Sequence, residues 1–537
     1  MWIPVLIFCL LLGGWVLLLA LPARWRVYGG WTAVAIPVLC LLLWLPLRSQ
    51  LPVVATRTAV PLPPFVWQID AISWPLTLWL LLLLTAALTV SSLGEAGGRK
   101  DSGNGQTSLP PASPLHPLTP SLAHLLIIAA FILPAVWAGS AATMMASWMA
   151  LLVVWGTAVW LAERGETARR RFFWQMGLLL TAVLLLWFGA AAADTVGWNA
   201  AAWPQTALLA ALLAALLPLG VWPLSGWRAS AGTPSAVALV LSLWPVAAGG
   251  VLLVRLAEGA SLTVWMGGML LTLAGLFGLL QGVRRLWERL HLPGMAVYFL
   301  TVSLVHLLLL TAVWGNQTSA SPHGVFALLR VLLLAGGIFY LAAGRPVTRR
   351  MWWRMIPPLI ALAAVAGLPL TAGLAGQVAL IEGLVGHGRY LALLVVLLLQ
   401  IPLLTAGLRL FWPTVGGDEA LPDTPAAWAT EAALFLPVLG LVSVSGIEWG
   451  AVSWFTWLLL LLVPVGSVLL LRFVPEFNRT VAAVRQAFTF RLPFNSAPLR
   501  QWLRGMGGAF EEAAAILEGD GSLVWLLILI VILLFVQ

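Results

Sequence analysis

Long apolar runs, separated by short polar or arginine-bearing segments, make up most of the sequence. A helix needs about 20 apolar residues to cross a bilayer, and by that measure the chain holds roughly sixteen such runs. The pattern therefore predicts an all-α polytopic membrane protein. The runs lie near Trp2–Leu21, Tyr28–Leu47, Ala71–Ser92, Leu122–Ser140, Ala142–Ala162, Phe172–Ala193, Thr206–Trp227, Ser235–Leu256, Ser261–Val283, Met295–Trp314, Val325–Gly344, Met355–Gly386, Tyr390–Trp412, Trp428–Gly446, Ala451–Leu471 and Ser522–Gln537.

Two of these runs carry helix-breaking residues inside them. Such residues weaken the backbone hydrogen bonds where lipid offers no replacement, so a break persists only inside protein or beside a wet cavity. Broken helices at corresponding places in two halves are typical of inverted-repeat transporters, with the ion site at the breaks. The alternative is that Pro and Gly are simply frequent in membrane helices. The residues are Pro218, Gly220 and Pro223 in Thr206–Trp227, and Gly367, Pro369 and Gly373 in Met355–Gly386.

The composition excludes a soluble domain, because 61% of the residues are hydrophobic and only 9% are charged. The 31 Trp residues suit interfacial belts. Cys9 and Cys40 both lie in apolar runs, so we expect neither a disulfide framework nor a metal site. No cofactor is expected, since the sequence has no Walker loop, dinucleotide fingerprint or metal-ligand spacing. The net charge of +9 does not indicate nucleic-acid binding, because its arginines are spread over short loops.

The arginines predict the orientation of the spans. The first run has no basic segment before it and Arg24 and Arg26 after it, which favours a retained helix with its N-terminus outside. With that orientation most Arg residues lie in inside loops, and only Arg48, Arg57, Arg389 and the boundary residue Arg255 lie outside. This asymmetry follows the positive-inside rule. We expect an integral protein of a prokaryotic cytoplasmic membrane.

Two connecting segments differ from the other loops. Residues 93–121 are rich in Gly, Ser and Pro and predict a disordered cytoplasmic connection. Phe477–Leu492 places Phe477, Val481, Val484 and Phe488 on one helical stripe. That stripe indicates an amphipathic helix at the membrane surface, although an ordinary cytoplasmic loop is an equally good interpretation.

Several short motifs resemble one family of membrane proteins. WQIDAISWPLTLWL, from Trp67, looks like a strand followed by the third span of that family. PLSGW at Pro223–Trp227 and AGTPSAVAL at Ala231–Leu239 resemble its turn before, and the start of, the eighth span. AGLPLTAGLAGQ at Ala366–Gln377 looks like the break in its twelfth span. The family is that of the antiporter-like membrane subunits of respiratory complex I, the NADH:quinone oxidoreductase, which is shared with multisubunit cation/proton antiporters.

The resemblance implies about fourteen core transmembrane helices in two inverted five-helix repeats, each with a broken helix, plus C-terminal extension helices. It also implies partners, namely other membrane subunits of a complex-I-like or multisubunit antiporter assembly, and a role in proton or cation/proton translocation. The chain would be at most a non-catalytic subunit of such an oxidoreductase. The expected parts are 1–121 (N-terminal helices and loop), 122–256 (first repeat), 261–412 (second repeat) and 428–537 (C-terminal helices with the interfacial segment).

The chain departs from the family where its intramembrane Lys and Glu residues would stand. A proton relay needs groups that change charge. Gln377 cannot titrate, and an arginine does not release its proton. We therefore predict a degenerate subunit with a mainly structural role. The matching positions are Met149 or Gly156 in the fifth span, Pro218 and Ser225 at the seventh, Ala247 in the eighth, Arg330 in the eleventh and Gln377 in the twelfth.

Three ionisable residues keep an active proton pathway open as an alternative: His306, Arg330 and Glu382. Gln377 is a fourth candidate position on that pathway, although its amide cannot titrate. His306 suits proton transfer, but a neutral histidine bonded to a neighbouring helix is the favoured interpretation. Glu382 could replace a lost charge, pair with Arg389 or sit at the membrane boundary, and Arg330 could snorkel. A stand-alone transporter or a lipid-modifying membrane enzyme also remains possible. The nearest acidic group for such an enzyme, Asp418, Glu419 and Asp423, lies on the predicted inside without a histidine.

Overall fold

The computed structural model describes residues 2–20, 26–57, 65–97, 118–162, 166–193, 198, 203–221, 235–259, 266–315, 323–343, 345, 347, 351–412, 424–442 and 452–473. Within these ranges, eight helices are long and apolar enough to cross a membrane, and several shorter apolar helices accompany them. Pro223, the predicted amphipathic segment Phe477–Leu492 and the last predicted span lie outside the described residues.

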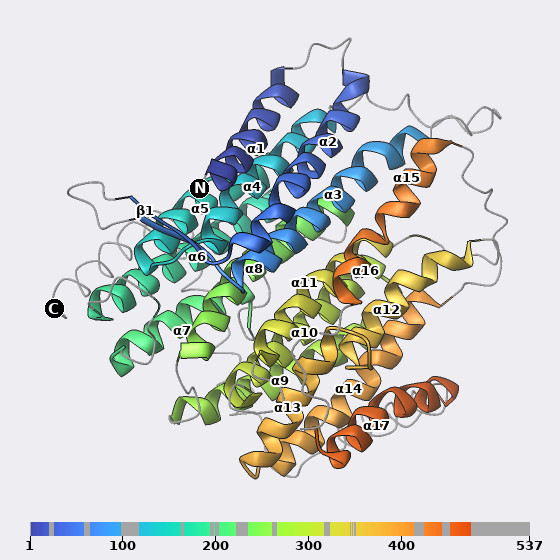
Figure 1. Ribbon diagram of the computed structural model, residues 1–537. Helices are drawn as coiled ribbons and strands as arrows, with labels where there is room; N and C mark the ends of the chain where they lie inside the picture. The colour runs from blue at the N-terminus through green and yellow to red at the C-terminus, as the bar shows by residue number, and fades with distance from the viewer. Residues whose placement is uncertain are drawn as a thin grey trace.

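The helices run side by side along one direction and form a single bundle (Figure 1). In this view α1 and α2 lie at one edge, and α14 and α17 lie at the opposite edge. The α-helices are α1 (Trp2–Ala20), α2 (Arg26–Trp44), α3 (Ser73–Gly97), α4 (Leu118–Val136), α5 (Ala141–Ala162), α6 (Glu166–Ala193), α7 (Gln205–Leu219), α8 (Ser235–Gly259), α9 (Met266–Glu288), α10 (Pro293–Trp314), α11 (Gly324–Ala342), α12 (Ile356–Val365), α13 (Gly373–Gly386), α14 (Tyr390–Phe411), α15 (Pro425–Ala433), α16 (Leu436–Leu441) and α17 (Trp454–Arg472). Two 3-10 helices, η2 (Leu45–Gln50) and η7 (Trp352–Met355), and two strands, β1 (Val53–Arg57) and β2 (Phe65–Ile69), complete the described elements.

The centre of the bundle is formed by α10 and α11. In their most apolar stretches 94% and 83% of the residues are buried, against 28% in α1, α2 and α17. The central helices are apolar around their whole circumference, as expected for helices enclosed by other helices. The peripheral helices expose large side chains such as Leu461 and Val468 of α17, which suits contact with lipid.

One end of the bundle carries a short β-hairpin. β1 pairs antiparallel with β2, with Val53 opposite Ile69. The α4–α5 connection lies along the other edge of β2, where Gly139 N donates to Val66 O at 2.8 Å. A Cβ atom at Gly139 would lie 2.8 Å from a methyl of Val66, so only glycine permits this approach. The end that contains residues 53–69 and 137–140 is referred to as the hairpin end.

Asp70 joins the hairpin to α3. Its Oδ1 accepts hydrogen bonds from the backbone N–H groups of Ile72 (3.1 Å) and Ser73 (2.8 Å), while Ser73 Oγ accepts from Asp70 N at 2.8 Å. These bonds satisfy N–H groups that have no partner inside the helix. The strand-then-helix pattern predicted from Trp67 onward is therefore confirmed, and the cap explains where α3 begins.

Tryptophans stabilise the hairpin end. Trp44 and Trp137 stack with ring centroids 5.5 Å apart. Trp44 Nε1 donates to Trp74 O at 2.9 Å, and Trp137 Nε1 donates to Thr77 Oγ1 at 2.9 Å. Each indole thus buries its apolar ring and satisfies its one donor at the end of a helix.

The predicted continuous span Trp428–Gly446 is wrong. The structure contains two shorter helices, α15 and α16, separated by Leu434 and Phe435. Pro437 explains the interruption, because it has no N–H to continue the α-helical hydrogen bonds. Phe435 N instead donates to Ala432 O in a tighter turn. The chain therefore has a third broken helix that its apolar pattern concealed.

Candidate functional site

The first predicted break coincides with the end of α7. Gly220 adopts the left-handed conformation (φ 65°), and its N–H points to the carbonyls of Leu216 and Leu217. Pro218 lies in the last turn of the helix. Gly249 of α8 packs here so closely that a Cβ would lie 2.6 Å from Ala215 O. The helix thus ends inside the protein, and the rest of the predicted interrupted helix, residues 222–227, lies outside the described residues.

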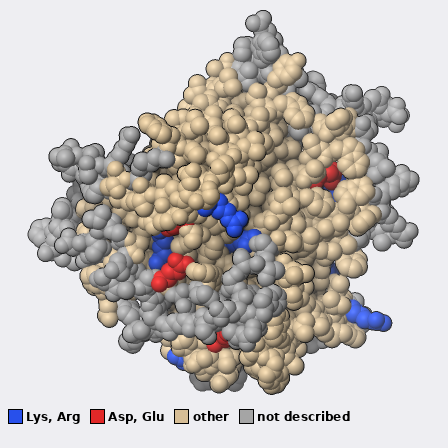
Figure 2. Space-filling model, in the orientation of Figure 1, with Lys and Arg blue, Asp and Glu red and all other residues tan. Residues whose placement is uncertain are grey.

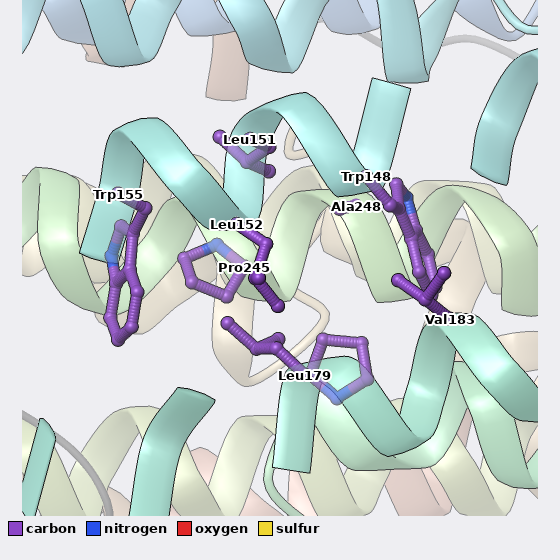
Figure 3. A pocket seen from close by; sticks show the side chains of 9 residues that line it. Trp148, Leu151, Leu152, Trp155, Leu179, Val183, Pro245 and Ala248 are labelled. Atoms are coloured by element: carbon purple, nitrogen blue, oxygen red, sulfur yellow. The ribbon is translucent and has the colours of Figure 1, made fainter. Parts of the chain in front are cut away.

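A small cavity of about 20 Å³ lies beside this break, between α5, α6, α7 and α8. Figure 3 shows the rings of Trp148 and Trp155 with Leu152, Leu179 and Pro245 around it. The lining side chains are mostly apolar, and the indole N–H groups of Trp148 and Trp155 are the polar groups that they bring to the cavity. The indole N–H of Trp148 is buried and has no hydrogen-bond partner among the described residues. The cavity is therefore small and largely apolar, and its lining carries no titratable side chain.

The positions that resemble the family's charged residues in this half also carry no charge. Ala247 is fully buried, and Met149 is 43% exposed on the outside of α5. Pro218 lines the small cavity. Among the described residues, the first break thus offers no titratable side chain.

The second predicted break separates α12 from α13. The connecting residues 366–372 contain Gly367 (φ 72°) and Leu370 (φ 68°), both left-handed. Pro369 is exposed in this turn. A Cβ at Gly373 would lie 1.6 Å from Ala364 O, so the first residue of α13 touches the backbone of α12. The turn is bonded to α16, because Ala372 N donates to Leu441 O at 2.8 Å.

Gln377 joins the two halves of this broken helix. Its Nε2 donates to Val365 O at 2.9 Å, and its Oε1 accepts from Gln400 Nε2 of α14 at 3.0 Å. Gln377 and Gln400 are 1% and 3% exposed. The bond to Val365 satisfies one of the carbonyls left open where α12 ends. Since neither amide titrates, this part of the break is a structural hydrogen-bond network.

Arg330 of α11 is held by two other elements. Its Nε donates to Gly440 O of α16 at 2.6 Å, and its Nη2 donates to the same oxygen. The guanidinium also lies over the Trp79 ring of α3, 5.0 Å from its centroid. A cation suits the open carbonyls at a helix C-terminus. Arg330 therefore points into the protein, and the snorkelling alternative is wrong.

His306 lies at the centre of the protein and is fully buried. Its Nδ1 is 2.7 Å from Val302 O of the same helix, and since a carbonyl only accepts, Nδ1 carries the proton. The ring fills the space left by Gly278 of α9, where a Cβ would lie 2.0 Å from Nε2. The contacts of His306 thus connect α9 and α10.

Glu382 lies at the end of α13 nearest α17. Its Oε1 accepts from Ser453 N and from Thr456 Oγ1, each at 3.4 Å. Carboxylates are favourable at helix N-termini, where N–H groups lack partners. The pairing with Arg389 is not found, since Arg389 lies over the Trp314 ring at 5.1 Å. None of the contacts described above joins two of the four predicted pathway residues directly.

A charged cavity at the hairpin end was not predicted. It has a volume of about 380 Å³, and its wall includes Asp70, Glu258, His323, Arg330, Ala372 and Ala375. Asp70 Oδ2 lies 3.3 Å from Arg255 Nη1, and Glu258 Oε1 lies 3.7 Å from His323 Nδ1. Figure 2 shows acidic and basic side chains side by side near the middle of a face that is otherwise mostly uncharged. Arg330 and the second break thus share one polar cavity.

A second charged cluster lies far from the hairpin, around Glu431 of α15. Arg354 binds this carboxylate with two bonds, Nε to Oε2 at 3.0 Å and Nη2 to Oε1 at 2.9 Å. Arg345 Nη1 lies 3.5 Å from Oε1. Burial lowers the pKa of the Arg345 guanidinium, while the charge of Glu431 raises it and that of Arg354 lowers it. The cluster connects α15 to η7, which contains Arg354, and to the segment between α11 and η7, which contains Arg345.

Comparisons with known proteins identify the fold. No protein-family model and no curated protein matches the chain. A chain in the structure of the Mrp complex from Dietzia sp. DQ12-45-1b superposes with a TM-score of 0.65 and 16% identity, over 99% of this chain and 62% of that one. A chain of respiratory complex I from Thermus thermophilus with bound NADH gives 0.60 and 19%, over 86% and 99%. The same complex with bound Aureothin gives 0.57 and 18%, over 81% and 96%.

The fold is therefore that of an all-α polytopic membrane protein, and it is shared with chains of the Mrp complex and of respiratory complex I. The predicted resemblance to membrane subunits of complex I and Mrp assemblies is confirmed at the level of the fold. The chain spans only about 62% of the Mrp chain that it matches, but nearly all of the matched complex I chain.

Proposed function

We propose that the chain is a membrane-arm subunit of a complex-I-like or Mrp-like assembly that translocates protons or cations, and that its own role is mainly structural. One observation carries this proposal: at neither break do the described residues place a titratable side chain. The first break adjoins a small cavity whose lining, mainly tryptophan, leucine and proline, carries no titratable side chain. The second is joined by Gln377 and Gln400.

The location of the assembly is part of the same proposal. We place the chain in a prokaryotic cytoplasmic membrane with its N-terminus outside, because its arginines concentrate in alternate loops. The hairpin end would then face outward. The domain boundaries 122–256 and 261–412 for the two repeats, with the C-terminal helices from 428, belong to this proposal as well.

The second candidate function is an active proton-conducting subunit. The charged cavity favours it, because Glu258 and His323 can both exchange protons and the cavity reaches Ala375 beside the second break. A complete path would also need titratable groups beyond Gln377. His306 and Glu382 do not supply them, because each is engaged in contacts between helices.

Co-purification tests the proposal. The chain, tagged at one end and expressed from its own locus, is extracted in mild detergent, and the accompanying proteins are identified by mass spectrometry. We expect other membrane subunits to co-purify, and a hydrophilic redox arm among them would indicate a complex-I-like assembly. An unrelated tagged polytopic protein is the control. Recovery of the chain alone, under conditions that preserve such assemblies, would favour a stand-alone transporter or enzyme.

A further inference from the structure

The charged cavity has an open mouth and a buried floor. His323 and Glu258 form the mouth, since their side chains are 65% and 32% exposed. Ala372 and Ala375 form the floor and are 6% and 3% exposed. His323 directly precedes α11, and Arg330 follows it by seven residues, which corresponds to about 10 Å along a helix. Arg330 therefore lies between the mouth and the second break.

The positive charge of Arg330 is fixed in position. Its guanidinium is held by the Gly440 carbonyl and by the face of Trp79, on two different elements. Both contacts leave the charge in place, and an arginine stays protonated at physiological pH. The two carboxylates have different positions and partners. Asp70 is paired with Arg255, and Glu258 lies at the mouth beside His323. The electrostatic potential in the cavity should therefore become more positive from the mouth to the floor.

We propose that Arg330 is the electrostatic barrier of this cavity, which admits water and small anions to the floor but keeps cations away from the α12–α13 break. Arginines lining narrow pores exclude cations in this way. The barrier would explain why cations do not reach the second break through the polar cavity. This inference deepens the proposed function, and it rests on that function only in assuming that the chain lies in a membrane.

Cysteine accessibility tests the barrier in the purified full chain. The native thiols are removed (Cys9→Ala, Cys40→Ala), and single cysteines are placed at the floor (Ala375→Cys) and at a reference position on α13 (Gly386→Cys), where an added Cβ meets nothing within 4 Å. Each protein reacts with sulfonatoethyl and trimethylammonioethyl methanethiosulfonate, which differ in charge. The ratio of the two rates cancels differences in thiol reactivity.

We expect the anionic reagent to be favoured at Ala375→Cys by about tenfold relative to the reference, because the Arg330 charge attracts one reagent and repels the other in a medium of intermediate polarity. Arg330→Gln should remove this preference, and Arg330→Lys should preserve it. An unchanged ratio in Arg330→Gln would overturn the barrier. So would a floor cysteine that reacts with neither reagent, because the cavity would then be closed.

A second comparison does not require Arg330 to be replaced. Ile72 also lines the cavity, next to Asp70, so Ile72→Cys samples the side of the carboxylates. With Arg330 intact, the anion preference should rise from Ile72→Cys to Ala375→Cys, and equal preferences would overturn the proposal even if Arg330→Gln fails to fold. None of these measurements needs a partner subunit. Their failure is therefore distinct from a failure of co-purification.

Discussion

Single residues show how the second break is stabilised without charge. Gln377 occupies the position that resembles a lysine of the family, and its amide joins Val365 O of α12 to Gln400 of α14. A lysine could donate to Val365 but could not accept from Gln400. The amide therefore suits a fixed connection between three helices better than a proton relay.

Replacing Gln377 should destabilise the connection between α12, α13 and α14. In Gln377→Leu, the buried Val365 carbonyl and the Gln400 amide both lose a partner, which costs about 1–3 kcal/mol for each buried polar group. We expect a lower unfolding midpoint in detergent. Gln400→Leu is the matched control, because it leaves the bond between Gln377 and Val365 intact and should cost less. Equal midpoints for the two variants would contradict this assignment.

The backbone of Leu370 is strained, and replacing this residue by glycine should increase the stability of the protein. Its φ of 68° is unfavourable for a residue with a Cβ, by about 1–2 kcal/mol. Its side chain is 66% exposed, so little packing is lost. Allowing for the larger chain entropy of glycine, Leu370→Gly should raise stability by up to about 1 kcal/mol. Leu368→Gly in the same turn should lower it, and a loss of stability in Leu370→Gly would argue against the strained turn.

At the scale of elements, the halves of the broken helix touch through their backbones. A Cβ at Gly373 would meet Ala364 O at 1.6 Å, and a backbone atom cannot move aside as a side chain can. Gly373→Ala should therefore cost about 3 kcal/mol, at the upper end of overpacking effects. Gly177→Ala in α6, where a Cβ meets nothing, is the matched control and should be neutral or stabilising. Similar unfolding midpoints for both variants would show that the halves are further apart.

The ion cluster around Glu431 holds α15 in place. Arg354 binds the carboxylate with two bonds, whereas Arg345 makes one contact at 3.5 Å. Removing one partner of a buried pair leaves an uncompensated charge and typically costs about 3–5 kcal/mol. Arg354→Ala should therefore destabilise the protein much more than Arg345→Ala in a thermal unfolding assay. The reverse order would mean that Arg345 is the main partner of Glu431.

The apolar pattern predicted the helices well and their connections less well. The breaks at Gly220 and at residues 366–372 follow from glycine and proline inside long runs, and both are found. The break between α15 and α16 was missed because it is marked only by Pro437, a single proline within a mainly apolar run. The strand β2 was predicted before α3, but its pairing with β1 depends on contacts that no local pattern reports.

At the scale of the whole molecule, the charged cavity could not be predicted from the sequence pattern, because its residues meet only through tertiary packing. Asp70, Arg255, Glu258 and His323 lie at the ends of three elements that are far apart in the sequence, and only the packing of α3, α8 and α11 brings them to one cavity. A clue was present, since Asp70 is an isolated acid among apolar residues. His306, Gln377 and Glu382 could be named from the sequence, but their contacts could not.

The two breaks also differ in a way that bears on function. The first lies against a largely apolar cavity of about 20 Å³, and the second adjoins a polar cavity of about 380 Å³ that contains Arg330. The first cavity has few polar groups to hold water, and the second presents a fixed positive charge, so neither favours conduction of cations.

Proton translocation by the intact assembly tests the central claim most directly. The purified assembly containing His306→Ala and Glu382→Gln together is reconstituted into vesicles, and its initial rate of proton translocation is compared with that of the wild type at equal assembly. We predict a rate within about twofold of the wild type, because neither side chain carries protons along a path. Loss of translocation while the assembly remains intact would contradict a mainly structural role.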